Sequence, residues 1–225
     1  MRVALIIPVW NEVEAIGRVL AEVPRDAVDE VFVVDGGSTD GTRERAEAAG
    51  ATVLAQQGRG YGAACLTGAR AATAELLVFL DGDYSDPPAE LARLVAPVVD
   101  GRADLVLGSR EAGRMERGAL PLHARAGNRL ALVLIQLLYG VHLSDLPSFK
   151  AIRRDTLLGL GIRDLHYGWT AEMVVRALRS QLRVAEVPID YRVRIGTSKV
   201  SATASGSVRA GWAILRAVIW TRFKR

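Results

Sequence analysis

Cysteine and histidine are scarce in this sequence. It contains one cysteine, Cys65, and three histidines, His123, His142 and His166, none of which has the spacing of a metal-ligand pair. A lone cysteine cannot form an internal disulfide, and a chain without disulfides fits a reducing compartment. These absences argue against a disulfide-stabilised fold and a zinc-type site, and they lead us to expect a cytoplasmic protein.

Long hydrophobic runs are also missing. The longest, residues 130–138, falls far short of the roughly 20 residues that a transmembrane helix needs. Such a run must be buried in protein or lie at an interface. Residues 1–9 contain one arginine followed directly by a short apolar run. This run is too short for a signal peptide and favours a first strand.

The chain has slightly fewer acidic than basic residues. The chain has 29 Lys and Arg against 25 Asp and Glu, a net charge of +4, and only 6% of its residues are aromatic. The excess favours anionic partners, which include nucleic acid, phospholipid surfaces and phosphorylated substrates. Because no nucleic-acid-binding motif or array of basic and aromatic residues is present, we expect no nucleic-acid partner.

Short apolar runs alternate with segments of helical spacing in the first half of the chain. The runs are 3–7, 31–34, 52–55, 76–80 and 104–107, and the helical segments are 12–23, 42–49, 61–72 and 89–99. This alternation is typical of βαβ units and predicts a mainly parallel sheet flanked by helices, an α/β fold. Half of the residues are hydrophobic, and the length fits one domain, 1–225. Near residue 110 the alternation stops, so we expect two halves, 1–109 and 110–225, with different tasks.

Carboxylates directly follow two of the predicted strands. Asp35 comes after the run 31–34, and Asp81 and Asp83 come after the run 76–80. In open α/β sheets, the carboxyl ends of the strands form the ligand crevice. Two carboxylates separated by one residue, a D-x-D motif, can place hard oxygens on a divalent ion that also bridges a diphosphate. The pattern therefore indicates a site for metal and phosphate.

Each of these motifs also has a simpler interpretation. Acidic turns often begin helices, and Asp40 with Gly41 fits an ordinary strand-to-helix turn, although this does not explain why a buried strand ends on Asp35. Residues 58–62 (GRGYG) could be taken for a dinucleotide fingerprint. They follow the third strand rather than the first and have the spacing G-x-G-x-G, which argues against NAD binding.

Five motifs occur together in the order typical of one enzyme family. They are Pro8–Glu12 (PVWNE), Asp35–Thr42 (DGGSTDGT), Gly58–Ala63 (GRGYGA), Asp81 with Asp83, and Gly108–Arg110 (GSR). In this combination the sequence resembles the family-2 glycosyltransferases, which have the Rossmann-like GT-A fold. Five motifs in family order are far more specific than any one of them.

The resemblance implies a nucleotide-sugar donor and a divalent cation. It assigns Mg²⁺ or Mn²⁺ to Asp83, with Asp81 beside it, and it implies inversion at the anomeric carbon. The residues that it assigns to the donor come from the first four motifs: Pro8, Asn11, Glu12, Asp35, Gly37, Ser38, Gly60, Asp81 and Gly82. It leaves open which sugar is transferred and whether the donor carries UDP or GDP.

Beyond the donor half, the sequence is similar to dolichol-phosphate mannosyltransferases and their bacterial polyprenyl-phosphate relatives. The residues that carry this similarity are Asp145, Phe149-Lys150, Glu172, Glu186–Pro188 and Arg194–Lys199. Two positions depart from the family pattern, because Ser85 stands where glutamine is usual and Ser148 where glycine is usual. These departures bear on the identity of the sugar more than on the reaction, and a catalytic part for Asp145 or Glu172 stays open.

A polyprenyl phosphate acceptor would bring a second anion into the site. A phosphate monoester has a second pKa of about 6, so at neutral pH it is a nucleophile that needs no strong general base. Cationic groups must instead hold the donor diphosphate and the acceptor phosphate close together. We assign the leaving diphosphate to the cation on Asp83 with Arg194 and Lys199, and the acceptor phosphate to Arg110, Arg125 and Asn128. The alternative for each basic residue is a solvated surface charge.

The C-terminal residues have the pattern of a membrane-binding helix. Val208, Trp212, Leu215 and Ile219 recur at helical spacing, and Arg216 lies off that stripe, as in a basic helix on anionic lipid. The alternative is a helix packed on the protein's own core.

Together these features predict a metal-dependent hexosyltransferase. It would move a hexose from a UDP- or GDP-sugar to a polyprenyl phosphate while attached peripherally to the inner face of the cell membrane. Two alternatives stay open: a soluble glycosyltransferase with a small phosphorylated or hydroxyl acceptor, and a nucleotide-sugar-binding module without catalysis. The sequence does not reveal the oligomeric state.

Overall fold

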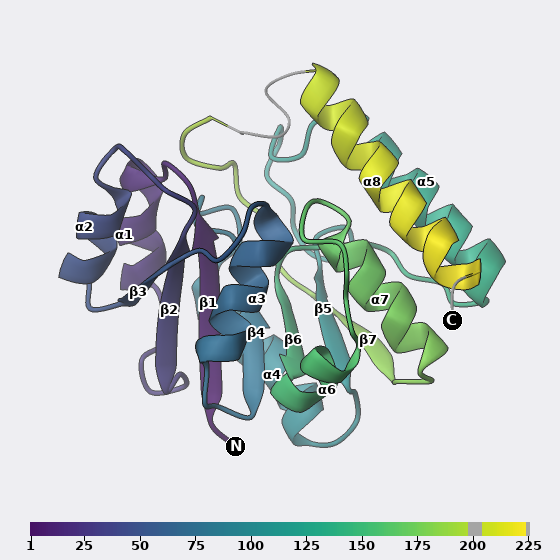
Figure 1. Ribbon diagram of the computed structural model, residues 1–225, viewed down its shortest axis with the longest axis horizontal. Helices are drawn as coiled ribbons and strands as arrows, with labels where there is room; N and C mark the ends of the chain where they lie inside the picture. The colour runs from purple at the N-terminus through teal and green to yellow at the C-terminus, as the bar shows by residue number, and fades with distance from the viewer. Residues whose placement is uncertain (198–203, 224–225) are drawn as a thin grey trace.

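The computed structural model describes residues 1–197 and 204–223, without the side chains of residues 204–210 and 223. Within these residues a seven-stranded sheet runs in the order β3-β2-β1-β4-β6-β5-β7 (Figure 1). Neighbouring strands are parallel except at β6, which is antiparallel to both β4 and β5. The strands are β1 Val3–Val9, β2 Glu30–Asp35, β3 Thr52–Ala55, β4 Leu76–Phe79, β5 Leu105–Ser109, β6 Lys150–Arg153 and β7 Val184–Pro188.

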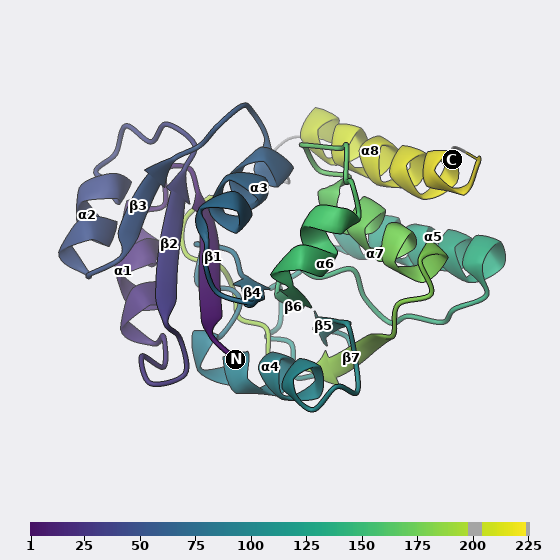
Figure 2. The same ribbon diagram turned by 60° about the horizontal axis from the view of Figure 1, so that its bottom comes forward.

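Helices cover both faces of the sheet. The helices α1 and α4 lie on one face, and α3 and α7 lie on the other (Figure 2). Their buried side chains join two separate hydrophobic clusters, one on each face. The helices are α1 Val13–Ala21, α2 Thr42–Ala48, α3 Tyr61–Ala71, α4 Leu91–Val99, α5 Leu122–Tyr139, α6 Arg154–Gly159, α7 Trp169–Arg179 and α8 Ala204–Phe223, and a 3₁₀ turn at Pro88–Glu90 precedes α4.

The predicted α/β fold is confirmed. All five predicted strands and all four predicted helices of the first half are present, most of them within two residues of the expected bounds. The strands β1 and β4 are buried nearly along their whole length, because a parallel strand in the middle of a sheet is covered on both faces. This burial explains their continuous apolar sequences.

The second half of the chain contributes to the same sheet. The strand β6 lies between β4 and β5, and β7 extends the sheet beside β5. The sequence pattern did not predict these two strands, because they are short and no regular alternation surrounds them. The sheet therefore crosses the boundary expected near residue 110.

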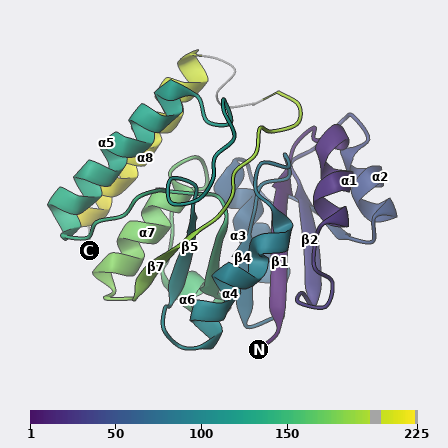
Figure 3. The same cartoon turned by 180° about the vertical axis from the view of Figure 1, so that it is seen from behind.

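The helices α5 and α8 form an additional layer outside α7. They lie side by side at the end of the molecule away from α1 and α2 (Figure 3), and the Tyr139 hydroxyl of α5 donates to the Val218 carbonyl of α8 at 2.8 Å. Two residues of the predicted stripe are exposed, Trp212 at 71% and Ile219 at 41%. Val218, which lies outside the stripe, is buried against the protein. The helix α8 thus has apolar side chains on both its inner and its outer side.

The apolar run 130–138 forms part of α5, and it too has apolar side chains on both a buried and an exposed side. Ala131, Leu132 and Ile135 are buried, while Val133 and Leu137 are exposed. None of the helices in the described part of the chain is long and apolar enough to cross a membrane.

The contact of α3 with the sheet depends on small residues. Gly68 faces β1 so closely that a Cβ there would lie 2.5 Å from Cγ2 of Ile6 and 3.2 Å from Cγ2 of Val34. Ile6 is fully buried and branched at Cβ, so it has little freedom to move away. This close approach sets how deeply the start of α3 lies beside the carboxyl ends of β1 and β2.

We predict that Gly68→Ala destabilises the protein by about 1–3 kcal/mol, because overpacking outweighs the better helix propensity of alanine. Gly127→Ala in α5 is the matched control: its Cβ would meet no atom within 4 Å, so we expect it to be neutral or to stabilise by up to about 1 kcal/mol. Urea denaturation of both variants measures the difference. Equal stabilities would contradict the close packing of α3.

Candidate active site

A cavity of about 550 Å³ opens at the carboxyl ends of four parallel strands. Its walls come from Pro8 and Trp10 around the end of β1, Gly36 after β2, Gln56 after β3 and Asp81 after β4. This is the edge of an open α/β sheet at which ligands bind. The structure also brings Glu12, Gly60, Gly82, Asp83 and Arg194 to the same cavity. Seven of the residues that the sequence assigned to donor, metal or catalysis therefore meet here.

The turn after β4 holds the Asp83 carboxylate in a fixed orientation. The Ser85 backbone N–H and hydroxyl both donate to Asp83 Oδ1, at 3.0 and 2.5 Å. The other oxygen, Oδ2, lies 3.2 Å from Nη1 of Arg194. Between them, Tyr84 has a φ of 71°, a left-handed conformation that non-glycine residues rarely adopt. Such strain is found mainly where surrounding contacts impose it, often at functional sites.

The position of Arg194 is fixed by backbone and side chain together. The Ile195 N–H donates to the Asp83 carbonyl and the Arg192 N–H to the Ser85 carbonyl, both at 2.9 Å. The Arg194 guanidinium also donates to Glu12 Oε1 at 3.0 Å. This guanidinium thus links the start of α1, the acidic turn and the segment after β7, three regions far apart in the sequence.

Two further carboxylates flank Asp83 in this turn: Asp81 is half-buried at the cavity wall, and Asp86 is fully buried. Burial and the charge of Asp83 raise the pKa of Asp81. Burial and the charges of Asp81 and Asp83 raise the pKa of Asp86 to about 7. Neither Asp81 Oδ1 nor Asp86 Oδ1 has a hydrogen-bond partner among the described residues. Buried acceptor oxygens without donors require an explanation, and a bound cation is one.

A buried ammonium group lies beside these carboxylates. Lys150 is fully buried and donates to the Pro147 and Ser148 carbonyls and to Thr170 Oγ1, at 3.2, 2.9 and 3.0 Å. Burial lowers the pKa of Lys150, while the nearby Cys65, Asp81 and Asp86 oppose that effect. Its position lets Lys150 compensate part of the negative charge of the turn.

The two serines that depart from the family pattern both bind this turn. Ser85 donates to Asp83, as described above, and the Ser148 hydroxyl donates to Asp86 Oδ2 at 2.9 Å. The departures therefore change the hydrogen bonding of the acidic carboxylates, a connection that the sequence did not reveal.

The glycine-rich loop before α3 is shaped by the segment that precedes α7. Gly60 has a φ of 104°, and a Cβ there would overlap the Leu165 carbonyl. The Ala63 N–H donates to that same carbonyl at 3.0 Å. Glycine is required at position 60 because of its positive φ and because a side chain there would overlap the Leu165 carbonyl. The contact also brings Tyr167 to the wall of the cavity.

Four residues assigned to the donor do not line this cavity in the described structure, namely Asn11, Asp35, Gly37 and Ser38. Three of them join the turns after β1 and β2 by hydrogen bonds. Asp35 Oδ1 accepts from the Ser38 N–H at 3.0 Å, and the Ser38 hydroxyl accepts from the Asn11 N–H at 2.8 Å. They support the cavity from behind, at the ends of β1 and β2. Lys199 lies outside the described residues.

The residues assigned to the acceptor phosphate gather in another region. Arg110 and Asn128 both bind the fully buried Asp145, the guanidinium through two 2.7 Å hydrogen bonds and the amide through one of 2.9 Å. Arg125 forms an ion pair with Glu111 at 2.9 Å. Arg125 and Asn128 line a second cavity of about 540 Å³, whereas Arg110 is not among its lining residues.

Asp145 and Glu172 both act as buried anchors. The Glu186 carboxylate accepts from the backbone N–H groups of Ser144 and Asp145, which holds Asp145 against Arg110. Glu172 accepts from the N–H groups of residues 163 and 164 and pairs with Arg176 at 2.6 Å. These contacts give both acidic residues a structural role.

Sequence reasoning missed Gln56 and Tyr167 as wall residues. Gln56 directly follows β3, just as Asp35 ends β2 and Asp81 comes shortly after β4, so its position at a strand end was an available signal. Tyr167 lies in an irregular segment that reaches the cavity only through tertiary contacts, and no sequence pattern marks it.

The family model described as "Glycosyl transferase family 2" matches residues 4–160. The chain belongs to this family. A dolichyl-phosphate hexose transferase of Haloferax volcanii is 34% identical over 209 residues, which cover 91% of this chain and 89% of that protein. An undecaprenyl-phosphate mannosyltransferase of Micrococcus luteus is also 34% identical, and the match covers 92% of this chain and 90% of that protein.

The fold of this glycosyltransferase is shared with a solved structure. Glucosyl-3-phosphoglycerate synthase from Mycobacterium tuberculosis, in complex with Mn²⁺, UDP-glucose and phosphoglyceric acid, superimposes with a TM-score of 0.81 at 23% identity. The match covers 98% of this chain and 79% of that one. It confirms the GT-A fold.

We predict that the stabilising effect of Asp86→Asn increases with pH. The native pKa of Asp86 is about 7 against an ordinary value of 3.8, so between these values the native state holds the proton more tightly than the unfolded state. Wild-type stability therefore falls as pH rises through this window. The asparagine keeps an oxygen for Ser148 and removes the titration. The Tm difference between variant and wild type, measured in EDTA, should be larger at pH 8 than at pH 5. A difference independent of pH would show that Asp86 is ionised throughout.

Proposed function

We propose that this family-2 glycosyltransferase is an inverting, metal-dependent enzyme. It moves a hexose from a nucleotide-diphosphate sugar to a polyprenyl phosphate at a membrane surface. The observation that carries the proposal is the strand-end cavity in which Asp83, with Arg194 paired to it, lies next to unsatisfied buried carboxylate oxygens. The matching relatives that act on polyprenyl phosphates support the acceptor.

The donor set of the turn fits a hard divalent cation. Asp81 and Asp83 offer carboxylate oxygens, which Mg²⁺ and Mn²⁺ prefer. Among the described residues, no three His, Cys, Asp or Glu side chains form a protein-only metal site. Such an open site suits a cation that is completed by diphosphate and water oxygens. When bound, the cation would neutralise charge on the leaving nucleoside diphosphate.

The protein's own cations would hold the two phosphate-bearing substrates. Arg194 lies at the donor cavity, where its planar fork can bind a diphosphate oxygen. Arg125 and Arg129 line the second cavity beside Asn128, where an acceptor phosphate can bind. Because that phosphate is already ionised at neutral pH, the site has to orient it and needs no strong base.

Membrane attachment would follow from the outer layer of helices. Leu137 of α5 and Trp212 of α8 are more than two-thirds exposed, at 75% and 71%. Exposed aromatic and aliphatic side chains on a helix with basic residues favour the interface of an anionic bilayer. The second cavity is partly formed by α5, so a lipid-linked phosphate could reach Arg125 while its tail stays in the bilayer.

We predict that Asp83→Asn lowers kcat at least about a hundredfold, as removal of a key electrostatic group does in other enzymes. The asparagine keeps an oxygen for Ser85, so the fold should be retained. Asp100→Asn, which removes an exposed carboxylate paired with Arg102, is the matched control and should leave kcat unchanged. The assay measures product from UDP- and GDP-sugars with Mn²⁺ or EDTA. Full activity in EDTA or in Asp83→Asn would contradict the metal mechanism.

We predict that Arg125→Gln raises the KM for polyprenyl phosphate about tenfold, which corresponds to one charge-assisted hydrogen bond, and leaves the donor KM unchanged. Arg43→Gln removes an exposed pair within α2 and serves as the control. The acceptor is supplied in anionic vesicles, and phosphoglyceric acid is tested as a soluble alternative. Preference for the soluble acid would replace the lipid acceptor. Donor binding without turnover on any acceptor would favour a non-catalytic module.

A further inference from the structure

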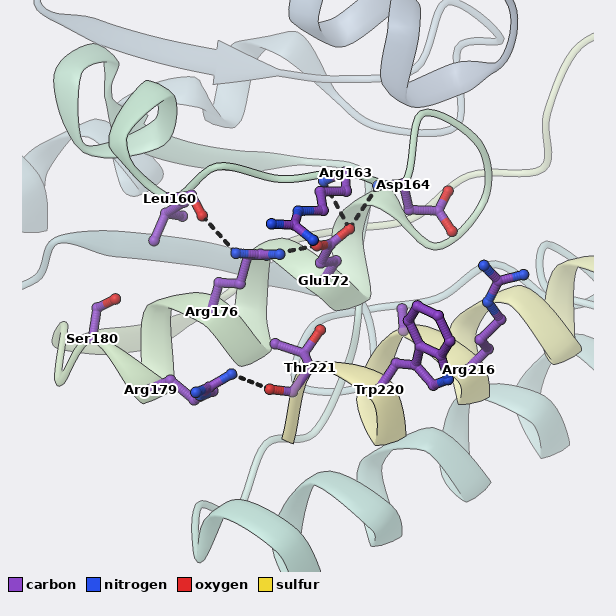
Figure 4. A pocket seen from close by; sticks show the side chains of 11 residues that line it. Leu160, Arg163, Asp164, Glu172, Arg176, Arg179, Ser180, Arg216, Trp220 and Thr221 are labelled. Atoms are coloured by element: carbon purple, nitrogen blue, oxygen red, sulfur yellow. Dashed lines mark hydrogen bonds and ion pairs between the residues drawn. The ribbon is translucent and has the colours of Figure 1, made fainter. Parts of the chain in front are cut away.

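A separate cavity of about 380 Å³ lies between α7 and α8. Figure 4 shows Arg176 and Arg179 reaching into it from α7, Arg216 and Trp220 from α8, and Arg163 from the segment before α7. Neither the donor cavity nor the cavity beside Arg125 shares any lining residue with it. The proposed reaction assigns no role to this cavity.

The charged groups of this cavity are mainly positive. Four arginines line it with two carboxylates, Asp164 and Glu172, which leaves a formal excess of two positive charges. Arg176 is accounted for by structure, since it pairs with Glu172 at 2.6 Å and donates to the Leu160 carbonyl at 3.0 Å. Arg179 donates to the Thr221 carbonyl of α8. Both belong to the last turn of α7, where cations stabilise the free carbonyls of a helix.

Arg163 and Arg216 line the same cavity as exposed side chains and have no such structural partner among the described residues. Neither guanidinium has a carboxylate within ion-pair distance in the part of the chain that the structure describes. Arg216 stacks on the Trp220 ring at 5.1 Å, which leaves the N–H edges of its guanidinium available. The Asp164 carboxylate accepts from the His166 N–H at 2.7 Å and pairs with neither arginine. Two uncompensated guanidiniums at one concave site raise the local positive potential.

We propose that this cavity binds a phosphate group. Guanidinium forks match phosphate oxygens in geometry and charge, and they bind them by strong charge-assisted hydrogen bonds. Leu160, Ala217 and the Trp220 ring provide apolar surface for the remainder of the ligand. The phosphate can belong to an anionic phospholipid headgroup or to a soluble compound. The exposure of Trp212 and Ile219 on the same helix makes the lipid a specific source to test.

Tryptophan indoles can report on this cavity and on the donor cavity independently. Trp220 lines the phosphate cavity, and Trp10 lines the donor cavity. In the ¹⁵N-labelled full chain, titration with inorganic phosphate should shift the Trp220 indole resonance saturably. That resonance is assigned with Trp220→Phe. The Trp10 resonance shows any phosphate bound at the donor cavity.

Arginine variants then test the assignment. Arg163→Gln should weaken phosphate binding about tenfold, since it removes one charge-assisted contact without touching the reporter ring. Arg216→Gln should weaken it as well, and Arg43→Gln on the distant α2 should leave it unchanged. A Trp220 shift that does not saturate, or an affinity unaffected by Arg163→Gln, would overturn the proposal.

Vesicles identify the source of the phosphate. Sedimentation is compared between phosphatidylcholine vesicles and vesicles that also contain phosphatidylglycerol. If the phosphatidylglycerol-dependent fraction is lost in the Arg163→Gln/Arg216→Gln double variant, the ligand is a lipid headgroup. If vesicle binding is the same in wild type and double variant while inorganic phosphate still binds the wild type saturably, the ligand is a soluble phosphate.

Discussion

Three carboxylates in one turn impose the electrostatic constraint on which the rest of the structure depends. Asp81, Asp83 and Asp86 lie within the six residues 81–86, shortly after the buried strand β4. Burial together with mutual repulsion raises the pKa of Asp81 and of Asp86. Such a cluster can persist only if cations and hydrogen-bond donors surround it. Lys150 from β6 and Arg194 from the segment after β7 supply positive charge. The acidic turn of the first half is therefore electrostatically incomplete without the second half of the chain.

The insertion of β6 is what brings these halves together. Because β6 is antiparallel between β4 and β5, its first residue, Lys150, pairs with Phe79 at the end of β4. The carbonyls of Pro147 and Ser148, just before β6, accept from the Lys150 ammonium. The Ser148 hydroxyl also donates to Asp86. A short strand thus places a cation and a hydroxyl donor behind the acidic turn. The same geometry accounts for the serine at a position where the family usually has glycine.

The residues at the strand ends could be predicted from the sequence more fully than the surroundings of the arginines assigned to the acceptor phosphate. Asp81, Asp83 and Gly60 could be predicted because strand ends and tight turns leave local sequence patterns, and parallel strands bring their ends to one edge. The sequence assigned Arg110 to the acceptor phosphate, and in the structure its guanidinium pairs with Asp145. Whether an arginine faces solvent, a ligand or a buried carboxylate depends on partners far along the chain. Arg110 belongs to the GSR motif and Arg125 to no motif, yet it is Arg125 that lines a cavity in the described structure.

By itself the sequence determined the α/β architecture and the acidic edge of the sheet, because hydrophobic periodicity and turn chemistry act over a few residues. The family was indicated by the resemblance of five motifs in order. Tertiary structure decided which groups compensate the buried charge and how β6 and β7 enter the sheet. It also decided that α8 packs with Val218 inward while Trp212 points outward. These outcomes depend on contacts between residues up to 182 positions apart, as for Arg194 and Glu12. Contacts at that separation leave no periodic signal in one sequence, because each partner is locally an ordinary charged or apolar residue.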